Sequence, residues 1–70
     1  KSYQQSTAVA RGVLNRIQGR ALNRDQAETA NRIRSFLLQA QEAQSKDPST
    51  AAQLAHRAEV LARDLQSTLR

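Results

Sequence analysis

The sequence predicts an all-α fold, a three-helix antiparallel bundle that forms one domain over residues 1–70. Helix-favouring residues dominate the composition, and apolar residues recur at spacings of three and four residues. Both glycines and the only proline lie at or before residue 48, at positions that can divide the chain. These observations place the helices at about residues 5–22, 24–45 and 48–69.

The expected first helix is the least regular of the three. Its apolar face is a line at four-residue spacing with one flanking leucine: Val9, Val13, Ile17 and Leu14. Gly12 and Gly19 each weaken this helix by about 1 kcal/mol relative to alanine. Gly19 is also suited to end the helix early, because glycine readily adopts the left-handed conformation of a helix cap.

The expected second helix has a well-defined start. Asn23 is a favourable N-cap, and Gln26 three residues later completes a capping box. The seam that follows alternates four- and three-residue spacings, as in a coiled coil, and consists of Gln26, Ala30, Ile33, Leu37, Ala40 and Gln44. Phe36 and Ala43 widen this seam on one side.

Asp47 and Pro48 mark the clearest boundary in the chain. Asp47 can cap the third helix, and Pro48 suits its first position, where no N–H is needed. Residues 45–47 then form a tight turn, so the second and third helices run antiparallel. The apolar stripe of the third helix is rich in alanine and consists of Ala51, Leu54, Ala55, Ala58, Leu61, Ala62, Leu65 and Leu69.

The apolar inventory is small for an independent domain. Apolar residues make up 39% of the chain, and twelve of them are alanine. A chain this short has little stability to spare, so we expect support from weak homo-oligomerisation or from a neighbouring domain of the parent protein. The chain starts at Lys1 and contains no methionine, which predicts a fragment of a larger or processed protein. No apolar run exceeds three residues, so no transmembrane segment is expected.

Reactive side chains are scarce, and we expect no catalytic, cofactor-binding or metal site. The chain has no cysteine, and its only histidine, His56, is predicted on the polar side of the third helix. Glu28 and Glu59 each lie one turn from an arginine, a spacing typical of surface ion pairs worth a few tenths of a kcal/mol. The sequence therefore predicts that the chain is not an enzyme.

The net charge of +5 belongs to the first half of the chain. Residues 1–34 contain seven basic and two acidic residues, whereas residues 35–70 contain four of each. The basic half supplies a candidate anion-binding set for nucleic acid or an acidic membrane surface: Arg16, Arg20, Arg24, Arg32 and Arg34. The other interpretation is a solvated face that happens to be rich in arginine, since only Tyr3 and Phe36 offer aromatic rings for stacking on bases.

Two large apolar residues lie off the predicted seams. Leu38 and Val60 are each more than about 120° from the apolar face of their own helix. They are candidate contacts with a protein partner or with a second copy of the chain, although single exposed apolar residues are common on protein surfaces.

Residues 33–65 read IRSFLLQAQEAQSKDPSTAAQLAHRAEVLARDL. This stretch resembles tetratricopeptide-like helical hairpins of bacterial proteins. Its first helix ends in QA..A, its turn carries an aspartate, and its second helix reads A..LA.RA..LA.DL. Ala51, Ala55 and Ala58 match the small residues of the second helix. Gln39 stands where glycine is expected, and the Trp, Leu-Gly and Tyr positions of the first helix are not matched. The resemblance implies a bacterial scaffold or docking element, in the periplasm or cell envelope, without an inherited active site.

The sequence thus predicts a non-enzymatic protein-interaction or structural helical module of a larger bacterial protein. The alternative is an accessory anion-binding module that uses the arginines of the first half. Salt dependence distinguishes the two, because binding to phosphate groups weakens steeply as the salt concentration rises.

Overall fold

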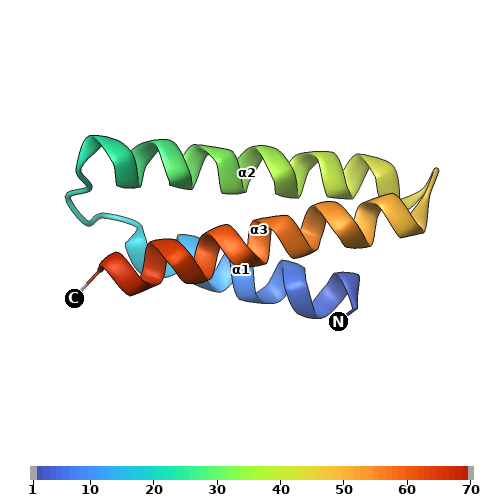
Figure 1. Ribbon diagram of the computed structural model, residues 1–70, viewed down its shortest axis with the longest axis horizontal. Coiled ribbons are helices and arrows are strands. Elements are labelled where there is room, and N and C mark those ends of the chain that lie inside the picture. Colours follow the sequence, from blue (N-terminus) through green and yellow to red (C-terminus); the bar gives the residue numbers. More distant parts are fainter. Residues whose placement is uncertain (1, 70) are drawn as a thin grey trace.

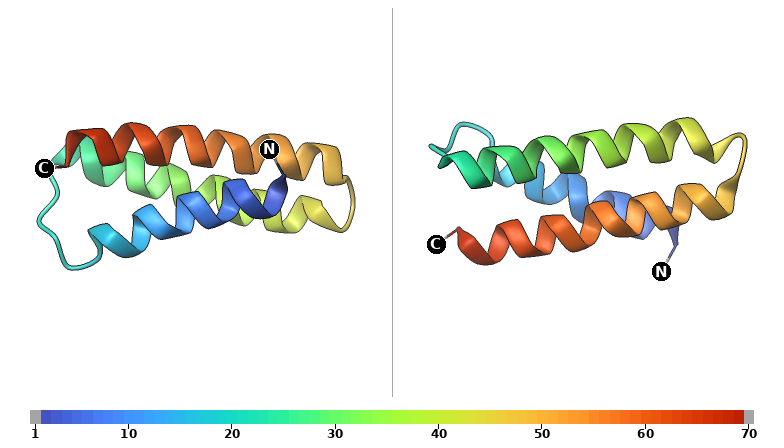
Figure 2. Two further views of the ribbon diagram at one scale, coloured as in Figure 1. Left: turned by 90° about the horizontal axis from the view of Figure 1, so that it is seen from below. Right: turned by 45° about the horizontal axis from the view of Figure 1, so that its top comes forward.

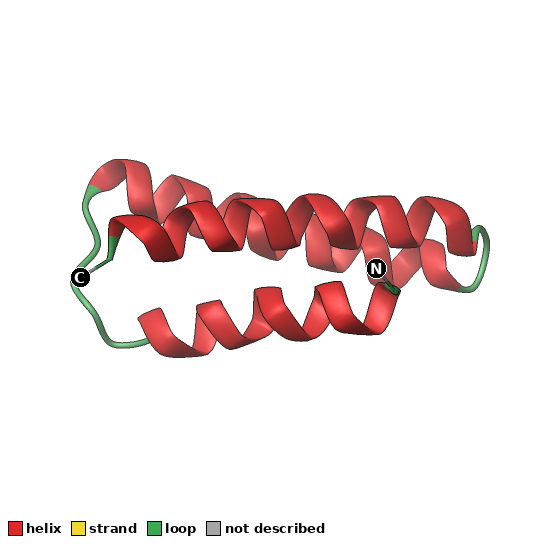
Figure 3. Ribbon diagram, turned by 60° about the horizontal axis from the view of Figure 1, so that its bottom comes forward, coloured by secondary structure: helices red, strands yellow, loops and turns green. Residues whose placement is uncertain are grey.

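The computed structural model describes residues 2–69 and confirms an all-α, three-helix bundle. The described part of the chain forms α1 (Tyr3–Ile17), α2 (Arg24–Gln44) and α3 (Pro48–Thr68), joined in an up-down-up arrangement (Figure 1). The bundle measures 36 × 18 × 16 Å, and its long axis follows the helices. Figure 3 shows the two connections at opposite ends of the bundle.

The first helix begins earlier than the sequence predicted because a capping box precedes it. The Gln5 N–H donates to Ser2 Oγ at 3.1 Å, and the Ser2 N–H donates to Gln5 Oε1 at 3.4 Å. This reciprocal pair satisfies two donors that a helix start otherwise leaves unpaired. The helix therefore starts at Tyr3 rather than near residue 5.

The predicted caps of the other two helices are confirmed. The Gln26 N–H donates to Asn23 Oδ1 at 2.8 Å, and the Asn23 N–H donates to Gln26 Oε1 at 3.0 Å. At the third helix, Asp47 Oδ1 accepts from the Thr50 N–H at 3.3 Å, and Pro48 occupies the first position. Both starts lie at the predicted residues.

The end of α1 differs most from the prediction. The helix stops at Ile17 instead of near residue 22, and Gly19 adopts a left-handed conformation with φ of +83°. The Arg20 N–H donates to the Ile17 carbonyl at 3.0 Å, so the chain turns immediately after the helix. Residues 18–23 then form a connection rather than a last helical turn. The helix therefore ends early, before Gly19, as the conformational freedom of glycine predicted.

Packing is centred on α3. Both α1 and α2 lie against α3 over much of their length, whereas α1 touches α2 far less. Figure 2 shows α1 beside the α2–α3 hairpin and running in the same direction as α3. The central cluster of the core takes three residues from each helix, and Ala40, Ala51 and Ala55 are buried beyond it. The cluster consists of Ala10, Val13, Ile17, Ala30, Ile33, Leu37, Ala58, Ala62 and Leu65.

Alanines rather than leucines occupy the centre of the α3 stripe. Ala51, Ala55, Ala58 and Ala62 are fully buried, and of the larger members of the stripe only Leu65 is buried with them, while Leu54, Leu61 and Leu69 are partly buried at its edges. In α1, Val13 and Ile17 of the predicted line are buried, whereas Val9 of that line and the flanking Leu14 are only partly buried. Small side chains at the contact allow the helix axes to approach closely.

Replacement of the two glycines should have opposite effects on stability. A Cβ added at Gly12 meets nothing within 4 Å, so Gly12→Ala should raise the free energy of unfolding by about 0.5–1 kcal/mol through helix propensity. Gly19→Ala should lower it by about 1 kcal/mol, because alanine is strained at a positive φ. Urea unfolding followed by circular dichroism measures both, and stabilisation by Gly19→Ala would contradict the left-handed cap.

The cap of α3 should make stability sensitive to acid. The Thr50 hydroxyl, 2.8 Å from Asp47 Oδ2, and the Thr50 N–H hold the pKa of Asp47 below its ordinary value of about 3.9. Because the folded-state pKa is lowered, the stabilising contribution of Asp47 is complete above the ordinary, unfolded-state value and is lost as the pH falls through the lowered pKa. Asp47→Asn, which keeps a cap, should therefore lose less stability than the parent chain between about pH 5 and about pH 2. Urea midpoints at the two pH values test this, and Thr50→Val should raise the Asp47 pKa in an NMR titration.

Candidate functional site

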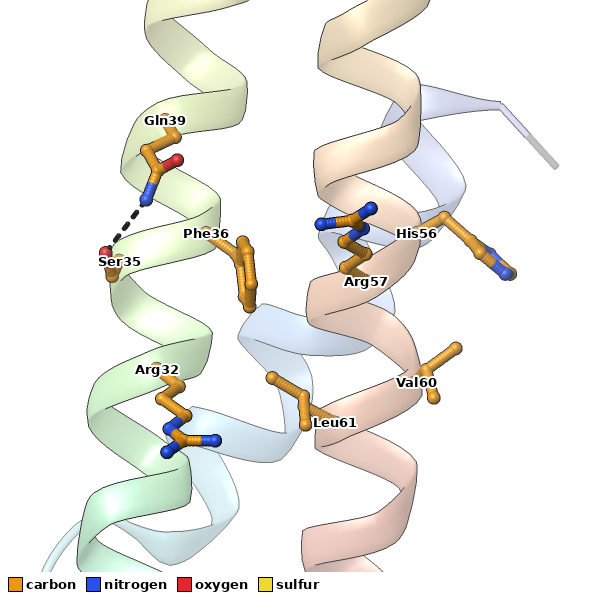
Figure 4. Close-up of a pocket in the computed structure, with 8 residues that line it drawn as sticks. All are labelled: Arg32, Ser35, Phe36, Gln39, His56, Arg57, Val60 and Leu61. Atoms are coloured by element: carbon orange, nitrogen blue, oxygen red, sulfur yellow. Dashed lines mark hydrogen bonds between the residues drawn. The ribbon is translucent and has the colours of Figure 1, made fainter.

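A surface groove of about 590 Å³ lies between α2 and α3. Figure 4 shows it on the side of the hairpin away from α1, which passes behind the two helices. The second helix contributes Arg32, Ser35, Phe36 and Gln39. The third helix contributes His56, Arg57, Val60 and Leu61. These eight residues define the α2–α3 groove.

Helical periodicity explains why these residues share one surface. The four positions on α2 follow an i, i+3, i+4, i+7 pattern, which places their side chains on one face of a helix. The four positions on α3 form two neighbouring pairs one turn apart. The groove therefore extends for about two turns, roughly 11 Å, along the hairpin.

The floor of the groove is apolar. Phe36 from α2 and Leu61 from α3 point into the space between the helices, half-buried against the edge of the core (Figure 4). Val60 forms a shoulder on α3, and its side chain is 51% exposed. Phe36, placed by the sequence beside the seam, thus reaches the surface rather than the centre of the bundle.

The rim of the groove is cationic. Arg32 and Arg57 extend over the floor from opposite helices, and His56 lies at the outer edge beside Val60 (Figure 4). No carboxylate is among the lining residues, and within residues 2–69 neither arginine forms a hydrogen bond or ion pair. The polar positions Ser35 and Gln39 bond to each other at 3.1 Å. The groove thus offers apolar area and free positive charge together.

The burial of Glu59 contradicts the expectation from the sequence that it forms a surface ion pair. Its predicted pairing with Arg63 is present, with Arg63 Nε 2.9 Å from Glu59 Oε2, but the glutamate is 2% exposed rather than a surface residue. The Ser6 hydroxyl of α1 donates to Glu59 Oε1 at 2.9 Å. A carboxylate can be buried at low cost when such hydrogen bonds and a charge partner compensate it. Glu59 therefore joins α1 to α3.

The cluster of Ser6, Glu59 and His56 does not form a catalytic triad. A nucleophilic serine needs a hydrogen bond to the imidazole, whereas the Ser6 hydroxyl donates directly to the carboxylate. His56 Nδ1 lies 4.0 Å from Glu59 Oε1, and the imidazole points toward solvent. Ser6 is 1% exposed, so no substrate reaches its oxygen. Within residues 2–69, no group of three or more histidine, cysteine or acidic residues is arranged to hold a metal ion.

The candidate anion-binding arginines come from three segments of the chain rather than from one helical face. The four-residue spacing of Arg16, Arg20 and Arg24 suggested one helical face, but they lie at the end of α1, in the connection and at the start of α2. Arg24 pairs with Glu28 at 3.8 Å. Arg32 and Arg34 are about 200° apart on α2, so only Arg32 lines the α2–α3 groove.

Leu38 and Val60 are both exposed, but they do not form one patch. Leu38 is 58% exposed and lies about 200° around α2 from Phe36, so it faces away from the α2–α3 groove. Val60 lines the groove. Of the two candidate contacts, only Val60 therefore belongs to a larger apolar surface.

No protein-family model, curated protein or solved structure matches this chain. Among residues 2–69, no helix is both long enough and apolar enough to cross a membrane. The α2–α3 groove was not identified from the sequence, because the meeting of Phe36 and Leu61 on facing sides depends on how the two helices pack.

Two glutamates that are equivalent in sequence should respond differently to truncation. Glu59→Ala should lower the free energy of unfolding by about 2–4 kcal/mol, because it opens a cavity and leaves the buried Ser6 hydroxyl without this acceptor. Glu28→Ala is the control and should cost less than about 0.5 kcal/mol, since Glu28 is 60% exposed. Equal urea midpoints for the two variants would contradict the burial of Glu59.

Proposed function

We propose that the chain is a non-enzymatic protein-interaction module that receives one helix of a protein partner in the α2–α3 groove. The carrying observation is the apolar floor of Phe36 and Leu61, continued by the exposed Val60, on the face of the hairpin that α1 leaves open. Covering such a surface stabilises a complex in proportion to the apolar area removed from water. Aromatic residues and arginines are also both enriched where proteins contact each other.

The geometry favours a protein partner over nucleic acid or a membrane surface. A phosphate-binding surface places several cationic groups along one face, whereas the arginines of the first half come from α1, the connection and α2, and Arg32 and Arg34 lie on opposite sides of α2. At the groove, the two arginines border an apolar floor rather than a continuous basic stripe. Catalysis finds no support in the Ser6–Glu59 cluster, whose hydroxyl is buried.

Site-specific photocrosslinking tests this function. A photoreactive residue at Val60 should yield adducts with a discrete protein in the cells that produce this chain, whereas the same residue at Leu38 should not. Leu38 is the matched control because it is similarly exposed but lies outside the groove. Mass spectrometry identifies the partner and the crosslinked segment.

Binding of the purified partner should then depend on the groove. Val60→Asp should abolish it, and Leu38→Asp should leave it unchanged, with circular dichroism confirming that both variants fold. Adducts that form equally from both positions, or that nuclease treatment removes, would overturn the proposed function.

A further inference from the structure

We infer that the partner segment is an acidic amphipathic helix, with apolar residues on one face and carboxylates on both flanks. The inference rests on the proposed function and adds the chemistry of the partner. Three features of the α2–α3 groove carry it, namely the spacing of its lining residues, its apolar floor and its uncompensated positive rim.

The spacing of the lining residues fits a helix. The i, i+3, i+4, i+7 row on α2 and the paired row on α3 are the ridges between which another helix packs. The opposite face of the same hairpin already holds α1. An extended peptide would need hydrogen-bond partners for its backbone, but Ser35 and Gln39 bond to each other, and His56 lies only at the outer edge of the groove. A helix satisfies its own backbone.

The apolar floor of the groove indicates where the partner helix carries its apolar residues. Phe36 and Leu61 lie between the two helices, with Val60 beside them, over about two helical turns. Apolar side chains at positions i, i+3 or i+4, and i+7 of the docked helix would cover this length. Such a segment presents two or three anchors, as in other complexes in which a helix occupies an apolar groove.

The rim sets the charge of the partner. Arg32 and Arg57 reach over the floor from opposite helices, and no carboxylate lines the groove. Carboxylates on the flanks of the docked helix would therefore pair with both guanidinium groups, whereas a basic helix would be repelled. A second copy of the chain does not fit, because a two-fold pairing would bring the arginines of both copies together and the net charge is +5.

Designed peptides test the inference on the full chain. Peptides of about 18 residues with one leucine face carry glutamate, glutamine or lysine on the flanks, and a scrambled glutamate peptide has no apolar face. In NMR titrations, the ordered glutamate peptide should shift resonances of residues 32–39 and 56–61. It should bind about tenfold more tightly than the glutamine twin at low salt, with a ratio that shrinks as salt is added.

Matched charge reversals separate the groove from the overall charge. Arg32→Glu with Arg57→Glu should remove the preference for the glutamate peptide and create one for the lysine peptide. Arg16→Glu with Arg34→Glu changes the net charge equally but lies outside the groove and should leave the preference unchanged.

Several outcomes would overturn the inference. Equal binding of the glutamate, glutamine and lysine twins at the groove would leave the proposed function standing but show that charge does not select the partner. If the scrambled glutamate peptide bound as tightly as the ordered one, the binding would be explained by net charge alone and not by an apolar helix face. Absence of shifts at the groove with every helical peptide would remove the proposed function itself. A DNA duplex that moves the groove resonances more than the glutamate peptide would assign the groove to nucleic acid.

Discussion

Alanine side chains along α3 set the spacing of the whole bundle. Four of them are fully buried, and they allow α1 and α2 to approach α3 closely on two adjoining sides. Protein interiors are packed too densely to absorb extra volume, so a larger side chain at Ala55 or Ala58 would push a neighbouring helix outward. The close axes contribute contact but little apolar area, because each alanine buries only one methyl group. The structure therefore depends on other interactions to fix the position of α1.

Glu59 supplies one of these interactions. Ser6 and Glu59 are 53 residues apart in sequence, and their hydrogen bond fixes the first turns of α1 against α3. Hydrogen bonding is incomplete on the side of α1 that faces α2, since the buried Thr7 hydroxyl has no hydrogen-bond partner within the described residues. A polar link of this kind favours one register of α1, because a shift of α1 along α3 would move the Ser6 hydroxyl away from the carboxylate.

The same alanine-rich packing explains the α2–α3 groove. With alanines at the centre of the contact, the larger Phe36 and Leu61 lie at its edge, where they are only partly buried. The hairpin has two long sides, and α1 covers one of them. An apolar floor beneath two unpaired arginines is thus a direct consequence of how the hairpin packs. The resemblance to tetratricopeptide-like hairpins, and the bacterial origin that it implies, remain predictions.

The sequence by itself determined where α2 and α3 begin, because a cap acts within three residues of its own position. Asn23 with Gln26, and Asp47 with Pro48, define their helices without reference to any other part of the chain. The capping box of Ser2 and Gln5 carried the same kind of signal, so the true start of α1 was also readable. Helical periodicity likewise placed Leu38 and Val60 on exposed faces.

Only the tertiary structure decided which neighbour covers each face. The spacing of Glu59 from Arg63 matches that of a surface pair, and its burial follows from the position of α1, encoded more than fifty residues away. Arg16, Arg20 and Arg24 likewise do not share one helical face, because the chain leaves α1 after Ile17 and reverses direction. Periodicity assigns a residue to a side of its own helix, but the partner on that side depends on the packing of the whole chain. For this reason the alignment of Phe36 with Leu61 in one groove emerged only from the assembled bundle.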